Sequence, residues 1–435
     1  MTAPFDSTPV GAPFGSLVDP ASFDRMWAEL EPVGRAPETG GYRRFAWTRT
    51  DHDLREWFAG ECAARGLDVV EDRAGNQWAW WGDPDATPGV VLGSHLDSVP
   101  DGGAFDGPLG VVSALAVVDE LRSRGVEPDV PLGVVNFVDE EGARFGVACA
   151  GSRMITGALD ADRARSLTDV DGVTMAQAWR SAGRDPDTLG ADPDTVARIG
   201  RFVELHVEQG KALALAPDGS DDLSDTSRAV AVGTDIWPHG RWRVDLPGEA
   251  NHAGTTRIED RRDAMLSLAD VVHATRSYAV GLGCVATVGK VQVQPGGVNA
   301  IASHVTAWLD ARGHSPSAVR ATVEAVTAEA ERLGGTVREE SWTPTTDFDA
   351  SLVSRLRGIL PGAPLLGTGA GHDAGILATH GVSAAMIFVR NPTGISHSPA
   401  ESATPDDCHH GVAALTAVVT DLCTRKDADL MSDAT

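Results

Sequence analysis

The chain has 435 residues, of which 42% are hydrophobic, and its 62 Asp and Glu outnumber its 36 Lys and Arg to give a net charge of −26. This length allows large cores and two domains, whereas the acidic excess disfavours nucleic acids and anionic membranes as partners. Apolar runs are far shorter than a membrane span, and the N-terminus lacks the basic and apolar segments of a signal peptide.

The cysteines are odd in number and scattered, and they include no Cys-x-x-Cys pair: Cys62, Cys149, Cys284, Cys408 and Cys423. This pattern argues against a disulfide framework and against a thiolate zinc site. Together with the missing signal peptide, it predicts a cytoplasmic protein.

The first half of the chain alternates between helical and strand patterns. Residues 23–65 are mostly helical in periodicity, and residues 69–80 alternate like a strand pair. Residues 89–94 and 130–138 predict buried strands, with a helix over residues 109–124 between them. Open α/β sheets bind ligands at the carboxyl ends of their strands. We therefore expect the polar residues that follow these two strands to meet at one edge of a sheet.

The second half contains a module with its own order. A polar, turn-rich stretch at residues 214–225 predicts a linker or surface loop. A strand, a helix, two strands, a helix and a strand follow, near residues 241–246, 261–278, 285–293, 304–310, 315–333 and 336–341. This βαββαβ order predicts an inserted α+β domain. The α/β pattern resumes at Phe348 and includes a buried strand at residues 384–389, so we expect a domain in two segments, 1–227 and 345–435, around an insertion at 228–344.

Several residues after the predicted strands have side chains that bind metals. His95 and Asp97 project to the same side of a strand end, so one could bind a metal and the other orient it. The alternative is a hydrogen-bonded pair on the surface. Asp106 follows a glycine-rich loop, and it could bridge two cations or cap the helix that begins near Pro108.

Glu140 and Glu141 repel each other, so they need either water or a cation at their strand end. A solvated pair is the common case, but the apolar residues around them make exposure less expected. The functional interpretation gives one carboxylate to a metal and the other to proton transfer. His206 could equally be a hydrogen-bonded core residue, and His397 could cap a turn.

The motifs that contain these residues, taken together, resemble the amidase branch of the M20 metallopeptidases. That branch contains N-carbamoyl-L-amino acid hydrolases, allantoate amidohydrolases and β-ureidopropionases. The resemblance extends from about residue 20 to 420, and the short spacing from His95 to Asp106 separates this branch from the M20 peptidases. The motifs are residues 93–99, 102–110, 140–145, 204–210, 249–256, 369–374 and 396–399.

The resemblance implies a mixed-sheet α/β/α catalytic domain of the zinc-exopeptidase type, interrupted by a ferredoxin-like lid that also forms a homodimer. It implies two divalent metal ions, zinc first, with manganese, cobalt or nickel as alternatives. One metal would be held by His95 and His206 and the other by Glu141 and His397, with Asp106 as the bridge. Asp97 would lie behind His95, and Glu140 would be the catalytic base.

Substrate-binding positions also follow from the resemblance, namely Gln209, His252, Asn299, Arg312 and Gly371. Arg312 offers a planar fork for a carboxylate, and Asn299 can add a hydrogen bond. His252, from its own or the partner subunit, would stabilise an oxyanion. From the residues alone, the favoured interpretations are a surface ion pair for Arg312 and a turn residue for Asn299.

The expected substrate is a small ureido acid, either allantoate or an N-carbamoyl-L-amino acid, which is cleaved to release ammonia and CO2. The alternatives are an N-formyl or N-formimino amino acid such as N-formyl-L-glutamate, a dipeptide, and a binding protein without catalysis. The chain departs from the family pattern at Arg257 and Ala302, where proline is usual, and in the segment Trp237–Trp242. These departures lie on or near the lid, so they bear on the choice of substrate.

Overall fold

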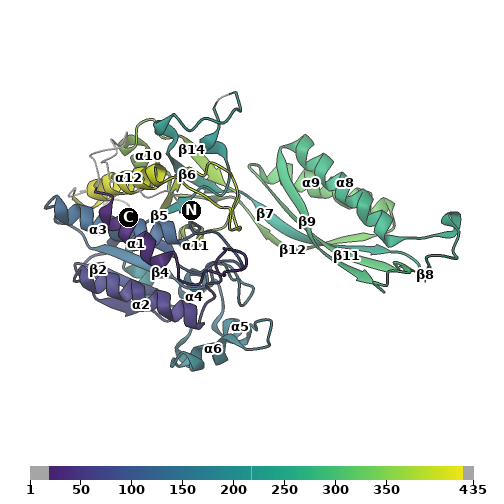
Figure 1. Ribbon diagram of the computed structural model, residues 1–435, viewed down its shortest axis with the longest axis horizontal. Helices are drawn as coiled ribbons and strands as arrows, with labels where there is room; N and C mark the ends of the chain where they lie inside the picture. The colour runs from purple at the N-terminus through teal and green to yellow at the C-terminus, as the bar shows by residue number, and fades with distance from the viewer. Residues whose placement is uncertain (1–18, 217, 425–435) are drawn as a thin grey trace. The chain divides into compact units, whose positions relative to one another are not determined.

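The computed structural model describes residues 19–216 and 218–424, which form two compact units. The inserted unit comprises Asp235–Thr346 and Gly367–Ala370, and the large unit comprises the other described residues (Figure 1). The inserted unit thus begins at Asp235 rather than at residue 228, because residues 230–232 pair within the sheet of the large unit.

The large unit is built on a nine-stranded mixed sheet. The four central strands β4, β3, β5 and β15 are parallel, whereas β2 and β6 join them antiparallel on either side. The order along the sheet is β1 (Val69–Glu71), β2 (Gln77–Trp81), β4 (Leu132–Phe137), β3 (Gly89–His95), β5 (Ile199–Val207), β15 (Ser383–Val389), β6 (Val230–Ile236) and β13 (Thr346–Asp347), with β14 (Leu365–Thr368) paired to β6.

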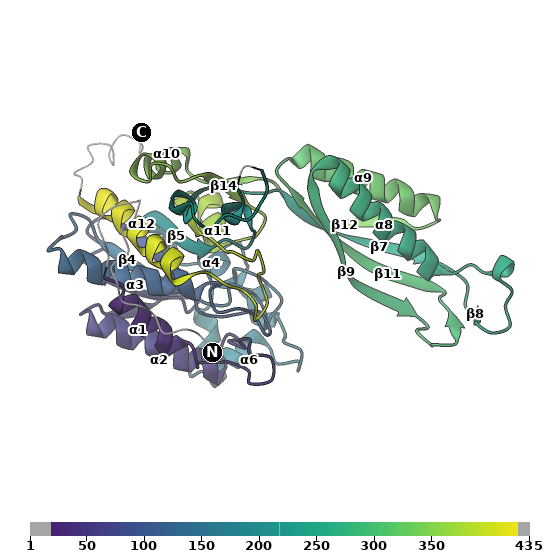
Figure 2. The same ribbon diagram turned by 45° about the horizontal axis from the view of Figure 1, so that its top comes forward.

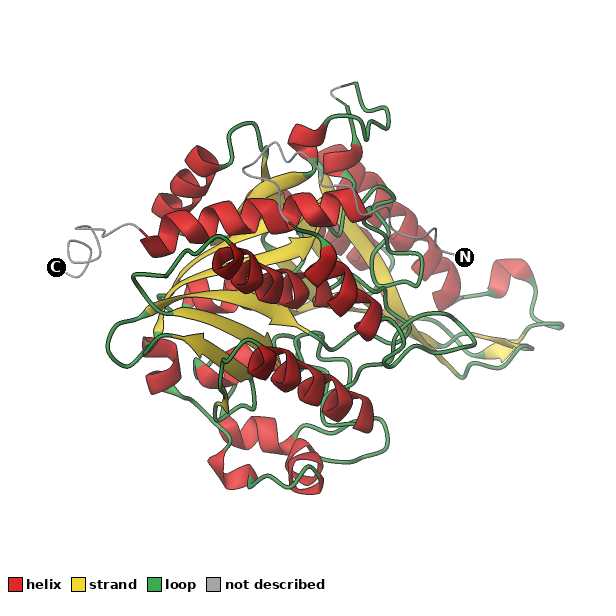
Figure 3. Cartoon of the chain, turned by 60° about the vertical axis from the view of Figure 1, so that its left-hand side comes forward, coloured by secondary structure: helices red, strands yellow, loops and turns green. Residues whose placement is uncertain are grey.

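Helices cover both faces of this sheet, because its central strands are apolar on both sides (Figure 3). Along β3, Val90 and Leu92 pack in the main core with α3 and α12, while aromatic residues such as Phe137 and Phe202 pack on the opposite face. The helices are α1 (Ala21–Leu30), α2 (Arg49–Ala64), α3 (Pro108–Ser123), α4 (Ala150–Ile155), α5 (Ala161–Ser166), α6 (Met175–Ser181), α7 (Pro193–Ala197), α10 (Ala350–Ile359), α11 (Asp373–Thr379) and α12 (Pro405–Thr424). None of the described helices is long and apolar enough to cross a membrane.

The region predicted to be mostly helical contains two helices. The helical pattern of residues 23–65 forms two helices, α1 and α2, separated by a loop over residues 31–48. Pro32 cannot continue a helix, and Gly34 and Gly40 adopt φ values of 72° and 77°, which an α-helix does not contain. The loop therefore folds back toward the glycine-rich segment before α3, where Tyr42 bridges to Gly102.

The inserted unit has the predicted ferredoxin-like βαββαβ fold (Figure 2). Its antiparallel sheet has the order β12-β7-β11-β9, and Val244 and Leu246 of β7 pack with Val305 and Leu309 of β11 beneath the two helices. A separate two-stranded ribbon joins β8 (Asn251–His252) to β10 (Ala300–Ile301). The main elements are β7 (His239–Pro247), α8 (Ala264–Leu282), β9 (Cys284–Gln294), β11 (His304–Gly313), α9 (Pro316–Arg332) and β12 (Thr336–Thr343).

Candidate active site

The metal ligands expected in the large unit lie at the carboxyl ends of its parallel strands. β3 ends at His95, Glu141 follows β4, and His206 lies at the end of β5. Two loops contribute the remaining groups, Asp106 just before α3 and His397 after β15. Segments that are far apart in the sequence therefore meet at the edge of the sheet where open α/β folds bind ligands.

Five side chains form two groups that share Asp106. In the first group, Nε2 of His206 lies 3.1 Å and Nε2 of His95 lies 3.6 Å from Oδ1 of Asp106. In the second, Nε2 of His397 lies 3.4 Å from Oδ2 of Asp106 and 3.6 Å from Oε2 of Glu141. Within each group the candidate ligand atoms lie within 4.8 Å of one another. Asp106 does not cap α3, whose N-cap is Gly107 without a side-chain hydrogen bond.

The ring orientations of the two buried histidines fit metal ligands. Nδ1 of His95 lies 3.1 Å from the carbonyl oxygen of Asp97, and Nδ1 of His206 lies 2.9 Å from that of Val207. A carbonyl only accepts, so each Nδ1 carries the hydrogen and each Nε2 keeps a lone pair. Both Nε2 atoms, like Oε1 of Glu141, are buried without a hydrogen-bond partner. Imidazole nitrogens and carboxylate oxygens are the atoms with which proteins bind divalent cations.

The negative charges of this cluster also favour a bound cation. Burial, and then the negative charge of Asp106, raise the pKa of Glu141 to about 7. Burial alone would raise the pKa of Asp106 as well, but the imidazoles of His206, His397 and His95, when protonated on the nitrogen that faces Asp106, hold its pKa well below its usual range. Two carboxylates this close ionise together only if positive charge lies between or beside them.

Asp97 orients both the first histidine and the two glutamates. Its Oδ1 lies 3.4 Å from Nδ1 of His95 and accepts the backbone N–H of Glu140 at 3.1 Å, and its Oδ2 accepts that of Glu141 at 3.0 Å. The turn between β4 and these glutamates is tight, with Asp139 at a φ of 53°. The expected position of Asp97 behind His95 is therefore only part of its role, because it also fixes the backbone that carries both glutamates.

Glu140 lies beside the cluster in a nearly closed environment. Its side chain is buried, with Oε2 3.6 Å from Nε2 of His95 and with the thiol of Cys149 donating to Oε1 at 3.2 Å. Burial raises the pKa of Glu140 well above its usual range, so this carboxylate has a high affinity for a proton. The sequence interpretation did not connect Cys149 with Glu140, because a lone cysteine carries no signal of the contact that it makes.

A buried glutamate that the sequence interpretation also missed fixes the loop of Asp106. Oε1 of Glu401 accepts the backbone N–H groups of Phe105 and Asp106, both at 2.9 Å, and its Oε2 accepts the hydroxyl of Ser396. Gln209, expected at the substrate, donates to Oδ2 of Asp106 at 2.8 Å. The late motif that contains His397 extends to Glu401, and that extension was the available signal.

The segment around Gly371 packs against His206. The ring of His372 lies 4.4 Å from that of His206, and its Nε2 is buried without a partner. Asp373 accepts the hydroxyl of Ser152 at 2.5 Å. Gly371 itself is exposed and has no atom within 4 Å of the position of a Cβ, so the chain leaves open space beside this motif.

The other expected substrate residues belong to the inserted unit and lie at opposite ends of its sheet. His252 pairs with Ala300 next to Asn299, and this ribbon directly precedes β11. Arg312 lies at the far end of β11, where it donates to Asp310 at 2.7 and 3.0 Å and to the carbonyl of Gly369 at 2.7 Å. β11 has 10 residues, so at about 3.4 Å per residue it is roughly 30 Å long.

Comparison with known proteins shows the family of this chain. The model of the peptidase family M20/M25/M40 matches residues 91–421. The chain belongs to this family. It is 35% identical over 408 residues to an N-carbamoyl-L-amino acid amidohydrolase of Geobacillus stearothermophilus, covering 90% of this chain and 96% of that one. It is 30% identical over 411 residues to the allantoate amidohydrolase of Escherichia coli, covering 91% and 96%.

A solved structure places this M20 chain in the same branch. The hydantoinase/carbamoylase-family amidase of Burkholderia multivorans superposes with a TM-score of 0.80 at 28% identity, covering 94% of this chain and 98% of that one. The M20 protein described here is therefore an amidohydrolase of the amidase branch. Its buried cluster of His, Asp and Glu is the arrangement by which it could hold divalent metal.

Proposed function

We propose that this enzyme hydrolyses the terminal C–N bond of a small ureido acid, either allantoate or an N-carbamoyl-L-amino acid. The observation that carries the proposal is the pair of ligand groups that share Asp106, with the buried base Glu140 beside them. The named relatives act on ureido compounds, which supports this substrate class. His95 and His206 would hold one divalent cation, and Glu141 and His397 the other.

The chemistry divides between the bound cations and the protein. Two divalent cations held here would acidify a water molecule and polarise the substrate carbonyl. Glu140 accepts the proton of the attacking water, and its raised pKa suits this task. A tetrahedral oxyanion forms, for which His252 offers a hydrogen bond. Glu140 then gives the proton to the departing nitrogen, ammonia leaves, and the remaining carbamate loses CO2.

The cations would be zinc on the basis of the donor set. Imidazole and carboxylate ligands in these numbers suit zinc, and they also suit manganese, cobalt or nickel. The two groups supply three imidazoles and two carboxylates and contain no cysteine: the ligands are His95, His206, His397, Asp106 and Glu141. A mixed nitrogen and oxygen site of this kind is typical of exchangeable hydrolytic metals.

The inserted unit supports an active site that two subunits share. Arg312 and the pair His252–Asn299 lie at opposite ends of β11, roughly 30 Å apart by strand length. A ureido acid is much smaller than this separation. If both ends contact substrate, each substrate therefore receives Arg312 from one subunit and His252 with Asn299 from the other.

A surface suited to such a homodimer lies on α8 and β9. β9 is an edge strand of the inserted unit, and an unpaired edge readily adds a strand from a second chain. Apolar side chains are exposed beside it: Val272, Tyr278, Val280 and Leu282 on α8, and Val285, Val291 and Val293 on β9. Exposed apolar groups that cluster in this way are typical of protein interfaces, so we propose that two copies pair through this edge.

The thiols support the cytoplasmic location expected from the sequence. All five cysteines are free, and Cys62, Cys149, Cys408 and Cys423 are buried. Proteins of oxidising compartments commonly use their cysteines in disulfides, whereas reducing compartments keep them as thiols. We therefore propose that the enzyme works in the cytoplasm.

The proposed activity is tested by ammonia release from a substrate panel. The metal-loaded enzyme is offered allantoate, several N-carbamoyl-L-amino acids and N-carbamoyl-β-alanine, with N-formyl-L-glutamate and a dipeptide assayed for amino-group release. We expect turnover of one ureido acid and its loss on addition of a chelator. Turnover of only the formyl compound or the dipeptide would contradict the ureido substrate while keeping the two-metal site.

Arg312 provides a test of carboxylate recognition. Three of its five N–H groups donate to Asp310 and Gly369, which leaves two for a substrate carboxylate. We expect Arg312→Ala to raise KM about tenfold to a hundredfold with little change in kcat, because it removes charge-assisted hydrogen bonds. Arg338→Ala, on the exposed part of β12, is the matched control and should leave KM unchanged. An unchanged KM in Arg312→Ala would remove this residue from the substrate site.

A further inference from the structure

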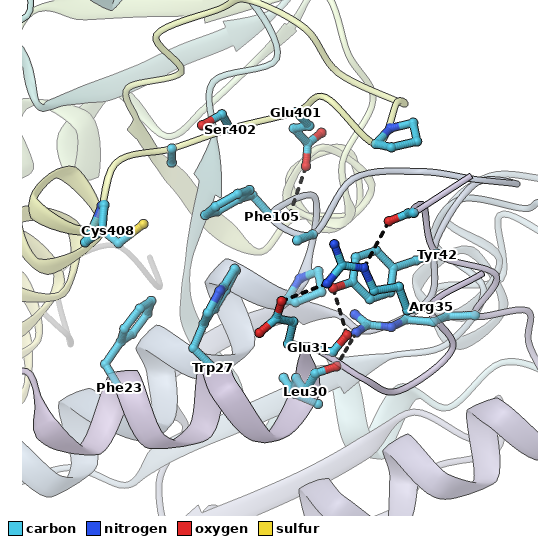
Figure 4. A pocket seen from close by; sticks show the side chains of 17 residues that line it. Phe23, Trp27, Leu30, Glu31, Arg35, Tyr42, Phe105, Glu401, Ser402 and Cys408 are labelled. Carbon is cyan, nitrogen blue, oxygen red and sulfur yellow. Dashed lines mark hydrogen bonds and ion pairs between the residues drawn. The ribbon is translucent and has the colours of Figure 1, made fainter. Parts of the chain in front are cut away.

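A cavity of about 470 Å3 in the large unit lies outside the proposed active site. It opens between α1, the loop that follows α1, the segment before α3, and the loop that leads into α12. Phe23, Trp27 and Phe105 form an aromatic wall, and Figure 4 shows these side chains between the α1 ribbon and Glu401. A cavity of this size and lining is typical of a site for a small organic molecule.

A buried cation lines the same cavity. Arg44 is 2% exposed, and its guanidinium donates to the carbonyl oxygens of Leu30 at 2.8 Å and Val33 at 2.9 Å. It also lies 4.1 Å from the centre of the Tyr42 ring. Within residues 19–216 and 218–424, no carboxylate pairs with it, and burial lowers its pKa to about 10. A buried charge without a counter-charge is costly, so the site favours an anion.

The other charged groups at the cavity are already satisfied. Arg35 pairs with Glu31 at 2.7 Å, and Glu401 accepts hydrogen bonds from the backbone of the Phe105 segment and from Ser396. Two of the five N–H groups of Arg44 donate to described residues, which leaves three donors for a ligand. The combination of aromatic walls with one uncompensated guanidinium selects an apolar molecule that carries a single carboxylate.

We propose that this cavity binds a small apolar carboxylate, of the aryl-alkyl class, with its carboxylate on Arg44 and its apolar part against Trp27 and Phe105. The site goes beyond the proposed hydrolysis and would exist without it. Trp27 and Phe105 already pack together, with ring centres 4.8 Å apart, so a ligand extends an existing aromatic contact.

The cavity is connected to the proposed metal site by four hydrogen bonds. Phe105 immediately precedes Asp106, and Glu401 holds the backbone N–H groups of both. On the other side, the backbone of Arg44 exchanges hydrogen bonds with Ser98, at 3.1 Å each way, next to Asp97. A ligand that orders Phe105 therefore also orders the residue proposed to bridge the metals. We expect occupancy to raise turnover, and this part of the inference rests on the proposed function.

Calorimetric titration of the metal-loaded full chain with 3-phenylpropionate tests the binding. The expected result is saturable binding to one site per subunit, with 3-phenylpropionamide binding at least tenfold more weakly. Arg44→Gln removes the guanidinium charge, whereas Ala403→Phe fills the cavity and leaves Arg44 in place. Both variants should bind 3-phenylpropionate at least tenfold more weakly. Arg35→Gln is the matched control, since its charge is already paired, and should keep the affinity within about twofold.

The active site itself could bind a carboxylate, so Arg312→Ala is titrated in parallel. Unchanged binding by Arg312→Ala places the ligand in the cavity, whereas loss of binding in this variant alone would overturn the proposal. Equal binding of acid and amide, no binding to the wild type, or full binding by both Arg44→Gln and Ala403→Phe would overturn it as well. In the turnover assay, we expect 3-phenylpropionate to raise kcat/KM at least twofold in the wild type but not in Arg44→Gln. An unchanged kcat/KM in the wild type would exclude the coupling to Asp106.

Discussion

Glu140→Gln is expected to remove nearly all turnover, lowering kcat by at least about a thousandfold, while the metal content and the melting temperature stay at wild-type values. Glutamine has the shape of glutamate and can still accept the Cys149 thiol at its amide oxygen. It cannot take a proton from water or return one to the departing nitrogen. The variant therefore removes only the proton transfer. The measurement is kcat on the preferred ureido acid after loading with metal.

The neighbouring glutamate provides the matched control for this result. Glu141→Gln changes the adjacent residue by the same single atom, but Glu141 faces His397 and Asp106 rather than Cys149. We expect it to lose bound metal as well as activity, as measured by elemental analysis. Substantial turnover in metal-loaded Glu140→Gln would contradict the role of general base. Equal metal loss in both variants would show that the two glutamates have not been assigned correctly.

The sequence predicted the large features of the fold because their patterns are local. The apolar runs before His95 and Asp139 form neighbouring parallel strands, as predicted. The strands of the predicted βαββαβ module form the sheet of the inserted unit. Helix ends and loops were less predictable. The mostly helical pattern of residues 23–65 did not show where one helix ends and the next begins, and Pro32 and two glycines with positive φ place a loop at residues 31–48.

The residues that hold the candidate site in place were harder to predict than those at its centre. His95, Asp106 and His206 were open to other interpretations one by one, and it was the resemblance of their motifs to a known family that assigned them to the metals. Glu401 acts through a contact across a long sequence separation, to the backbone of Asp106, whereas Cys149 reaches the carboxylate of Glu140 from a turn that follows shortly after it in the chain. The only sequence signal for Glu401 is that it lies at the end of the His397 motif, and Cys149 has none, because the packing around a buried glutamate or cysteine decides its contacts.

An active site shared between subunits is expected to give activity when two inactive variants are combined. Chains carrying Arg312→Ala or His252→Ala are co-expressed with different tags, and the heterodimer is purified on both tags. One of its two sites then takes intact Arg312 from one chain and intact His252 from the other. We expect about half of the wild-type kcat per dimer, at wild-type KM, because one of two equivalent sites is complete. Sites built from a single chain would leave the heterodimer as impaired as its parents.

The reciprocal heterodimer makes the opposite prediction and so excludes indirect rescue. When a chain with both substitutions pairs with a wild-type chain, a shared site always lacks either Arg312 or His252, and the heterodimer is expected to be impaired in both sites. If each chain completed its own site, the wild-type chain would instead supply half of the activity. The two heterodimers contain the same substitutions in the same numbers and differ only in their distribution. The difference between their activities therefore shows whether Arg312 and His252, at ends of β11 roughly 30 Å apart, reach one substrate only when two chains pair.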